Sequence, residues 1–449
     1  MRRRADGPIH GPMTQRAFPI LFITATRIGD AVLSSGLIRM LADEIPGARF
    51  TIVAGPLAAP LFAHVPGLDR VIVMEQGKGK GHWFKLWNQV RHKKWSLVVD
   101  LRGSATAYFL RRDKRAIWKK TPGEVVHKVI DAARVLKLDG APPAPHLYIT
   151  PDVQALADQM LAPKPGETAG PLLAMGPASN WVGKIWPIER FAQTAGRLLG
   201  PDGPMAGGRL LILGGPGDGR MVEELRMASA RGRCIDLTGK VDLLTAYACL
   251  KRADLFIGND SGLMHIAAAA GAPTLGLFGP SDDRRYAPWG ELTRVVRGPR
   301  TFEQFLAVDP ELSQAIRHMS DLPVATVVKA AKALLIDAQA ARSAALQARS
   351  EATLAAARAL DLFPEPEPEP EQVSEAESEA IEIVEMEQVL APEDLTPAAP
   401  SPEPEPEVLP QSDGPLASEP KAPRAAVAEP VLDAPAPRSS PRRRAPKPK

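Results

Sequence analysis

Short apolar runs alternate with longer mixed stretches from residue 17 onward. The apolar runs predict strands, and the stretches between them predict helices. In the first part of the chain, strands are expected at Ile20–Ile23, Arg49–Val53, Arg70–Met74 and Ser96–Leu101, with helices from Ala31 to about Glu44 and from near Pro56. Strands that alternate with helices in this way predict a parallel sheet.

A second series of the same kind follows a stretch rich in Pro and Gly, residues 163–171. Strands are expected at Leu172–Met175, Arg209–Leu213, Arg233–Asp236, Leu255–Ile257 and Thr274–Leu277, and helices at Ile188–Leu199, Arg220–Ala230, Leu243–Lys251 and Leu263–Ala270. The pattern predicts a second α/β domain with its own parallel sheet.

The chain thus divides into six parts. Residues 1–16 are expected to be a flexible leader, residues 17–162 and 172–322 two domains joined by the linker 163–171, and residues 323–361 one or two Ala-rich helices. Residues 362–449 contain Pro-Glu repeats and few apolar side chains. Burial cannot offset the entropy of ordering such a segment, so a disordered tail is expected.

The net charge of +3 conceals opposite charges in two parts of the chain. Residues 362–449 hold 19 acidic and 8 basic side chains, which leaves 33 acidic and 47 basic, a net charge of +14, in residues 1–361. A basic folded part favours an anionic partner: a phosphorylated substrate, an acidic lipid or a nucleic acid. Because no known nucleic-acid-binding motif occurs, a nucleic-acid partner is not expected.

Cysteine spacing and hydropathy bear on where the protein works. Cys234 and Cys249 match no metal or redox spacing, which is typical of a reducing compartment. No run of about 18 uncharged apolar residues occurs, so no membrane-spanning helix is expected. The basic N-terminus and the run Phe18–Ala25 imitate a signal peptide, but the run is short and enters Arg27–Asp30 rather than a cleavage site. A first strand is therefore the expectation.

Three polar turns that follow expected strands carry the candidate chemistry. The first is Thr26–Asp30, between the first strand and the first helix. Asp30 would lie at the carboxyl edge of the sheet, where a carboxylate facing a second domain can act as a general base. The alternative is a carboxylate that only caps the helix.

The second turn, Gly176–Pro187, follows the first strand of the second domain. Ser179 and Asn180 offer polar groups to a phosphate, and Lys184 offers a mobile positive charge. The alternative is an ordinary polar loop in which Trp186 and Pro187 pack at the start of a helix.

The third turn is Gly258–His265, in which Asn259–Gly262 precede an Ala-rich helix. The side chains of this turn are able to cap the helix, and the free N–H groups and dipole of its first turn favour a phosphate-like anion. The stretch by itself is equally typical of a plain βαβ unit. The nearby Gly214–Gly219 lacks the spacing of a dinucleotide fingerprint, and Asp282-Asp283 is expected to be a turn rather than a metal site.

Together these turns resemble glycosyltransferase family 9, the ADP-heptose:lipopolysaccharide heptosyltransferase family. The resemblance spans about residues 17–322 and includes Ile28–Asp30, Gly176–Pro187, Thr238-Gly239, Gly258–His265 and Phe278–Ser281 in that order. It implies a GT-B fold, in which two Rossmann-like domains face each other across a cleft, the first for the acceptor and the second for the nucleotide-sugar donor. It also implies transfer of heptose from ADP-heptose to the lipid A–core oligosaccharide with inversion, without a cofactor or an essential metal.

The resemblance assigns roles residue by residue. Asp30 matches the general base. The donor-binding residues are Ser179, Asn180 and Lys184 in the second turn and Asp260, Ser261, Gly262, Leu263 and His265 in the third. The segment Thr24–Arg27 departs from the arginine- and serine-bearing form often found in the family.

Acceptor contacts are expected in the first domain, where basic and aromatic residues gather at His82–Trp95 and Arg111–Arg115. The candidate contacts are Arg27, Arg102, Arg111 and Arg112. Basic residues beside aromatic ones suit a phosphorylated glycolipid at a membrane surface. The alternative is a solvated amphipathic helix with Trp83 and Trp87 packed inward.

The sequence therefore predicts an inverting, metal-independent glycosyltransferase that uses ADP-heptose and a lipid A–core acceptor. It is expected in the cytoplasm of a Gram-negative bacterium, in transient contact with the inner face of the inner membrane. Three alternatives stay open: transfer of another nucleotide sugar, a GT-B sugar-nucleotide epimerase, and a non-catalytic sugar-nucleotide-binding scaffold that acts through its tail.

Overall fold

The structure, a computed structural model, describes residues 16–75, 81–164, 166–167, 169–229, 232–312 and 316–359, with side chains up to residue 356. The expected tail 362–449 and all but the last residue of the expected leader 1–16 lie outside these residues. Both sheets of the protein belong to one compact unit. No helix in the described ranges is long and apolar enough to cross a bilayer.

Five parallel strands form the first sheet of the described chain, in the order β3-β2-β1-β4-β5. The strands are β1 (Phe18–Ile23), β2 (Ala48–Ala54), β3 (Leu68–Val73), β4 (Trp95–Asp100) and β5 (Arg112–Ile117). The connecting elements are α1 (Ile28–Leu33), α2 (Ser35–Glu44), η1 (Ala59–Phe62), α3 (Gly81–Val90), η2 (Thr106–Phe109), α4 (Lys128–Ala133), η3 (Arg134–Leu136) and α5 (Pro151–Leu161).

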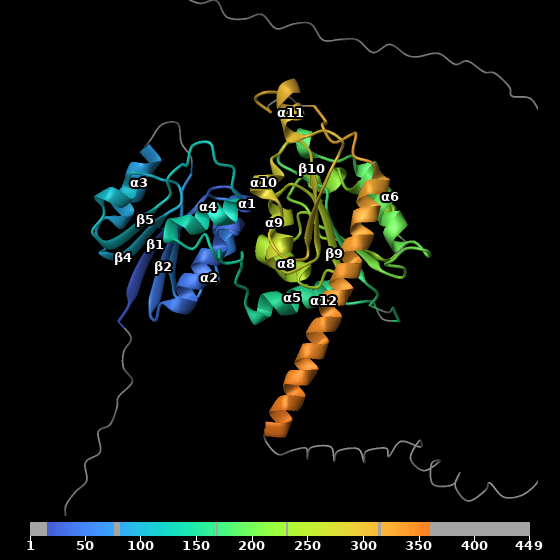
Figure 1. The fold of residues 1–449 in the computed structure, drawn as a ribbon, viewed down its shortest axis with the longest axis horizontal. Helices are drawn as coiled ribbons and strands as arrows, with labels where there is room; N and C mark the ends of the chain where they lie inside the picture. The colour runs from blue at the N-terminus through green and yellow to red at the C-terminus, as the bar shows by residue number, and fades with distance from the viewer. Residues whose placement is uncertain are drawn as a thin grey trace, which may run out of the picture. The chain divides into compact units, whose positions relative to one another are not determined.

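Side chains of β1 alternate between two apolar layers, as a central strand requires. Ile20 and Phe22 pack with α1 and α2, whereas Leu21 and Ile23 pack with α3 and η2. Figure 1 accordingly shows α2 and α3 on opposite sides of this sheet.

Six parallel strands form the second sheet of the described chain, in the order β11-β10-β9-β6-β7-β8. The strands are β6 (Leu172–Gly176), β7 (Arg209–Ile212), β8 (Cys234–Asp236), β9 (Leu255–Asn259), β10 (Thr274–Phe278) and β11 (Thr293–Arg297). The connecting elements are η4 (Val182–Lys184), α6 (Ile188–Leu199), η5 (Asp218–Arg220), α7 (Glu223–Met227), α8 (Leu243–Leu250), α9 (Gly262–Ala269), α10 (Asp283–Tyr286), α11 (Phe302–Val308) and α12 (Val324–Ala359).

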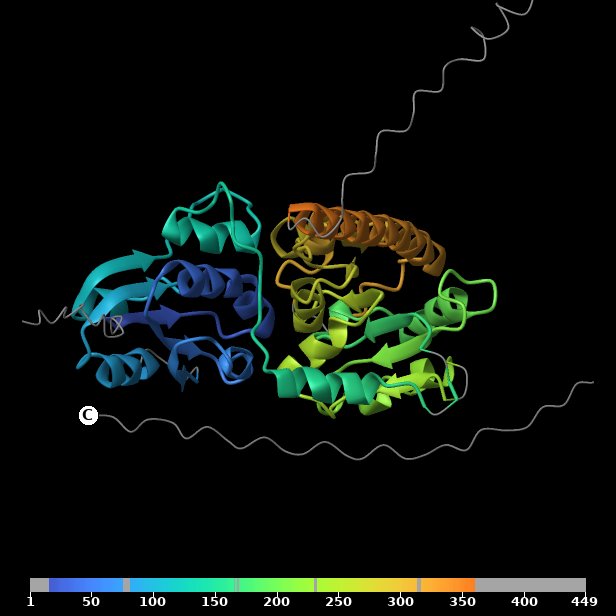
Figure 2. The ribbon, with the colours of Figure 1, turned by 90° about the horizontal axis from the view of Figure 1, so that it is seen from below.

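Helices cover both faces of the second sheet, and Figure 2 shows α5 and α12 on opposite sides of it. The helix α5 lies after the first sheet in the chain but joins the second, since Arg252 pairs with Asp158 at 2.8 Å and Arg209 donates to the Leu161 carbonyl. The Ala-rich segment is a single extended helix, α12, whose last buried side chain is Ala338.

Each sheet has one point at which the strand order reverses. In the first sheet the reversal lies between β1 and β4, and in the second it lies between β6 and β9. Ligands of open α/β sheets bind beyond the carboxyl ends of the strands at such switch points. The segments that follow these strands are the ones expected to form the site: Thr26–Asp30 after β1, and the second and third turns after β6 and β9.

The predicted alternation of strands and helices is confirmed, with errors at three helices and two edge strands. The helix expected from Ala31 to Glu44 is broken at Ser34, whose hydroxyl bonds to the Ala31 carbonyl and to Thr24. A helix near Pro56 is only a single 3-10 turn, and the helix expected at Arg220–Ala230 is shortened to α7. The edge strands β5 and β11 were not predicted, because charged residues interrupt their apolar pattern, as is common at sheet edges.

Candidate active site

Asp30 lies in the first turn of α1, directly beyond the end of β1. Its side chain lines a cavity of about 290 Å³ at the switch point of the first sheet. Burial raises the pKa of the Asp30 carboxyl above its usual value, while the charges of Lys128 and Arg27 oppose the rise. A partly buried carboxylate with a raised pKa, open to a cavity, is suited to accept a proton.

Two glycines allow the starts of α1 and α9 to approach each other across the two sheets. A Cβ atom added to Gly29 would lie 2.9 Å from His265 Cδ2, and one added to Gly262 would lie 2.7 Å from Ile28 Cγ2. A side chain at either glycine would therefore require His265 or Ile28 to shift or the helices to separate. The close approach brings Asp30 within electrostatic reach of Asp260.

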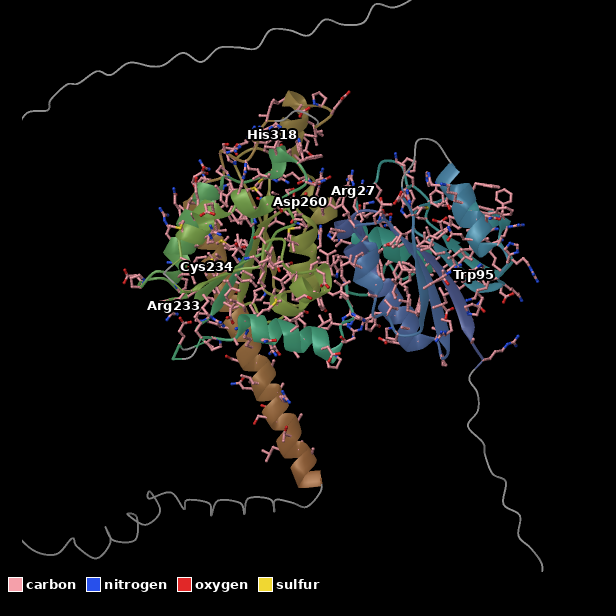
Figure 3. The ribbon with its side chains drawn as sticks, turned by 180° about the vertical axis from the view of Figure 1, so that it is seen from behind. Arg27, Trp95, Arg233, Cys234, Asp260 and His318 are labelled. Carbon is pink, nitrogen blue, oxygen red and sulfur yellow. The ribbon has the colours of Figure 1, made fainter. Side chains whose placement is uncertain are left out.

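Figure 3 shows Arg27 and Asp260 where the two halves of the site meet. Arg27 is the exposed residue before α1, whereas Asp260 is buried at the end of β9. The candidate donor and acceptor turns therefore face each other, as the resemblance implied.

Asn259 joins the second and third turns into one unit. Its side chain is fully buried; Nδ2 donates to the Pro177 carbonyl at 2.6 Å, and Oδ1 accepts from the Trp186 N–H at 3.2 Å. The turn after β10 supports the same unit, because Gly279 lies against Met319 and near the Gly183 carbonyl. The buried Asn259 amide thus holds the two candidate donor turns together, although Asn259 was not among the residues expected to bind the donor.

Lys184 and Asp260 connect the two turns through an ion pair of 2.6 Å. The Lys184 side chain as a whole is a quarter exposed. Ser179 Oγ donates to the Asp260 carbonyl at 3.3 Å and lies 3.5 Å from Oδ1 of Asn180, which is exposed. Four of the residues predicted to bind the donor therefore meet at one place.

The start of α9 has no side-chain cap, contrary to expectation. The Asp260 carboxylate turns to Lys184 instead, and Ser261 Oγ is buried without a hydrogen-bond partner among the described residues. No described side chain therefore caps the first N–H groups of α9. An uncapped helix N-terminus favours an anion.

The remaining donor candidates lie on α9 itself. His265 is buried, and burial lowers the pKa of its imidazole to about 4, so the ring is neutral near pH 7. It packs against Gly29 and keeps the two helices in contact rather than supplying charge. Leu263 is half-buried beside Gly176 and closes the apolar side of the turn.

The cavity beside Asp30 contains several residues that were not predicted. Lys128 donates to Asp131 Oδ2 at 3.2 Å, and the Trp118 indole N–H donates to Asp131 Oδ1 at 2.8 Å. Tyr286 reaches the same cavity from α10 of the second sheet. These residues come from segments without a recognisable motif, so no signal in the sequence identified them.

Among the four candidate acceptor arginines, the structure separates two from the others. Arg27 and Arg102 line the cavity with Asp30. Arg111 and Arg112 lie at the start of the edge strand β5, and the Arg112 guanidinium donates to the Tyr108 and Leu110 carbonyls. Nothing in the described ranges brings Arg111 or Arg112 to the cavity.

No group of three or more His, Cys, Asp or Glu side chains in the described ranges is arranged to hold a metal ion. The thiols of Cys234 and Cys249 are free, and burial raises the pKa of each to about 11. Both cysteines therefore lie within the fold as unreactive side chains.

Comparison of the sequence with known proteins identifies relatives along most of the described chain. The model of the family described as glycosyltransferase family 9 (heptosyltransferase) matches residues 89–305. Lipopolysaccharide heptosyltransferase 2 of Salmonella typhimurium is 25% identical over 312 residues, which cover 62% of this chain and 87% of that protein. Lipooligosaccharide heptosyltransferase 2 of Haemophilus influenzae is 27% identical, with coverage of 62% and 88%.

Solved structures share the fold. The crystal structure of a family 9 glycosyl transferase from Veillonella parvula has a TM-score of 0.58 at 23% identity, covering 71% of this chain and 98% of that one. The E. coli ADP-heptose lps heptosyltransferase II has a TM-score of 0.56 at 21% identity, covering 72% and 100%. The fold is GT-B, as predicted. These matches show that the chain is a glycosyltransferase, similar to glycosyltransferase family 9 over the matched residues.

Proposed function

We propose that this glycosyltransferase moves heptose from ADP-heptose to a sugar hydroxyl of the lipopolysaccharide inner core. The names of its relatives support heptose transfer to lipopolysaccharide, and the name of the similar E. coli structure includes ADP-heptose. The observation that carries the proposal is the position of Asp30, a partly buried carboxylate that lines a cavity and lies opposite the uncapped N-terminus of α9.

The residues suit a single displacement. The acceptor hydroxyl enters the cavity and loses its proton to Asp30 as its oxygen attacks the anomeric carbon of the heptose. The bond between that carbon and the diphosphate breaks on the opposite side, and ADP leaves with the electron pair. One displacement of this kind inverts the configuration at the anomeric carbon.

Positive charge for the leaving ADP is supplied by the protein in this proposal. Lys184 pairs with Asp260, and Ser261 and the first N–H groups of α9 directly follow Asp260 in the chain. Preorganised donors of this kind stabilise charge that develops in a transition state. The proposed reaction therefore has no resident metal ion. Activity that survives exhaustive treatment with a chelator supports this part, and activity restored only by a divalent cation contradicts it.

The proposal places the protein in the cytoplasm, at the inner face of the inner membrane, in transient contact with the lipid surface. The net charge of +14 in residues 1–361 supports contact with an anionic glycolipid. The experiment is product analysis by mass spectrometry and NMR after incubation with ADP-heptose and a deacylated inner-core acceptor. A heptosylated acceptor with inverted anomeric configuration is expected.

The same experiment separates the alternatives. If the enzyme transfers sugar from a different nucleotide sugar but not from ADP-heptose, the proposed donor is wrong. Conversion of the nucleotide sugar without acceptor indicates an epimerase. Removal of residues 363–449, nearly the whole expected tail, tests the scaffold hypothesis, because an enzyme keeps its turnover after this deletion whereas a scaffold loses its partner.

A further inference from the structure

A second cavity lies beside the one that holds Asp30, and its walls are aromatic. It measures about 590 Å³, lies between α3 and η2, and is walled by Trp83, Phe84, Trp87 and Phe109 over a floor formed by residues 103–106. We define this cavity as the aromatic groove. Its volume falls in the range of roughly 300–1,000 Å³ that is usual for ligand sites, which are mostly apolar with few polar groups.

The groove is held open by hydrogen bonds beneath and across it. The Trp87 indole N–H donates to the Phe109 carbonyl at 3.1 Å and ties α3 to η2. The buried Asp100 carboxylate accepts from the N–H groups of Arg102 and Ser104, both at 2.9 Å, and so fixes the floor. The groove is therefore a formed feature of the first sheet rather than a gap between loose side chains.

Its rim exposes apolar surface to solvent. The exposed fraction is 68% for Phe84 and 71% for Phe109. Neighbouring exposed aromatic side chains of this size indicate an interaction site. The sequence alternative of an amphipathic helix with inward-packed tryptophans is correct only in part, because Trp83 and Trp87 pack against the core and also wall the groove.

The chain segment that forms the groove is basic. Residues 81–115 contain nine Lys and Arg side chains and two Asp side chains. One of the two acids is the buried Asp100, and the other, Asp113, pairs with Lys94 at 2.7 Å. An apolar groove with this basic surround matches an amphipathic ligand that has a hydrocarbon part beside an anionic group.

Arg102 connects the groove to the site of transfer, since it is the one residue shared by the linings of the two cavities. Its guanidinium lies 4.8 Å from the centre of the Trp83 ring, and its Nη1 is buried without a hydrogen-bond partner among the described residues. A ligand that fills both cavities would pass this unpaired donor, which suits a phosphate oxygen.

We propose that the aromatic groove binds an acyl chain of the acceptor glycolipid, with a phosphate of the same molecule at Arg102 and its sugar hydroxyl at Asp30. This inference rests on the proposed function, because it concerns the lipid part of that acceptor. The groove makes the enzyme select an acylated acceptor over a free oligosaccharide.

The test compares kcat/KM for the acylated acceptor with kcat/KM for the same acceptor after its acyl chains are removed. The variant Phe84→Ser/Phe109→Ser removes the two exposed rings. The control Met227→Ser/Leu346→Ser removes side chains that are 76% and 68% exposed and lie on α7 and α12. The acylated-to-deacylated ratio is expected to fall roughly tenfold, or about 1.4 kcal/mol, in the groove variant, with the wild-type ratio in the control.

A ratio that is unchanged in the groove variant overturns the proposal. If that variant instead loses binding to phosphatidylglycerol vesicles while the ratio is unchanged, the surface contacts the bilayer and the acyl-chain assignment is wrong. If the wild type transfers sugar to neither acceptor, the proposed function fails on its own. Quenching of tryptophan fluorescence by spin-labelled stearate still tests the groove, since equal quenching of wild type and groove variant contradicts it.

Discussion

The donor turns of the second sheet and the acceptor cavity of the first sheet are built differently. The donor turns take their polar groups from two short segments, which Asn259 and the Lys184–Asp260 pair fasten together. The cavity beside Asp30 draws on five separate stretches between Ala25 and Tyr286. In the proposed reaction, a compact motif would therefore bind the diphosphate that all such donors share, whereas dispersed side chains would bind the variable acceptor.

The largest expected loss of activity is at Asp30, because the proposed acceptor half and donor half act on the same reaction there. Asp30→Asn keeps the shape of the side chain but cannot accept the acceptor proton. We expect kcat to fall by roughly 10²–10⁴-fold, the usual contribution of general acid–base catalysis. Steady-state kinetics with saturating donor and acceptor measures the loss.

Binding of ADP, measured by calorimetry, is the control for Asp30→Asn. The affinity should stay close to that of the wild type because the donor turns are intact. A variant that keeps more than a tenth of the wild-type kcat, with ADP binding unchanged, would remove Asp30 from the role of base.

Lys184→Met tests the donor half alone. The variant loses one preorganised positive charge and leaves the buried Asp260 carboxylate without its partner at 2.6 Å. Transfer is expected to slow by roughly 10²–10³-fold, the cost of removing one such group. The exposed Lys329→Met on α12 is the matched control, and a Lys184 variant with the kinetics of that control places the diphosphate elsewhere.

Asn259→Ala sharpens the comparison, because it removes the fastening between the donor turns without touching their candidate ligand groups. The Trp186 N–H and the Pro177 carbonyl lose their buried partner, which costs about 1–3 kcal/mol for each buried group left unsatisfied. We expect a lower melting temperature and a raised KM for the donor. Asn88→Ala, which removes an exposed bond to Arg91, should change neither; equal effects of the two variants refute the role of Asn259.

The same difference explains what could be predicted from the sequence. The position of each candidate donor turn could be predicted because it is a local feature: each is a polar segment between a strand and a helix, and one sequence window contains all its groups. The strand–helix alternation is local in the same sense, and most elements of both sheets were placed to within a few residues. The break at Ser34 was missed because it depends on contact with Thr24, which no local pattern contains.

The acceptor half could not be assembled in this way. Lys128 and Asp131 reach the cavity because the chain returns across the first sheet after β5, a charged edge strand that resembles a solvated loop in sequence. Arg111 and Arg112 became acceptor candidates because they lie in a basic segment, but neither lines the cavity, and Arg112 donates to the Tyr108 and Leu110 carbonyls. A cluster of basic residues in the sequence predicts a basic surface. Which of these residues reach the cavity depends on the topology of the sheet.

The smallest expected effect concerns Lys128, which acts on Asp30 through charge. Burial raises the pKa of Asp30, and the Lys128 ammonium lowers it, so Lys128→Met should raise that pKa further. Asp30 accepts a proton only when ionised, and kcat/KM therefore rises with pH through its pKa. The variant should shift this rising limb to higher pH and approach the wild-type rate above it, while the exposed Lys332→Met keeps the wild-type profile. An equal loss of kcat/KM at every pH would instead mean that Lys128 contacts the acceptor directly, since Lys128 also lines the cavity.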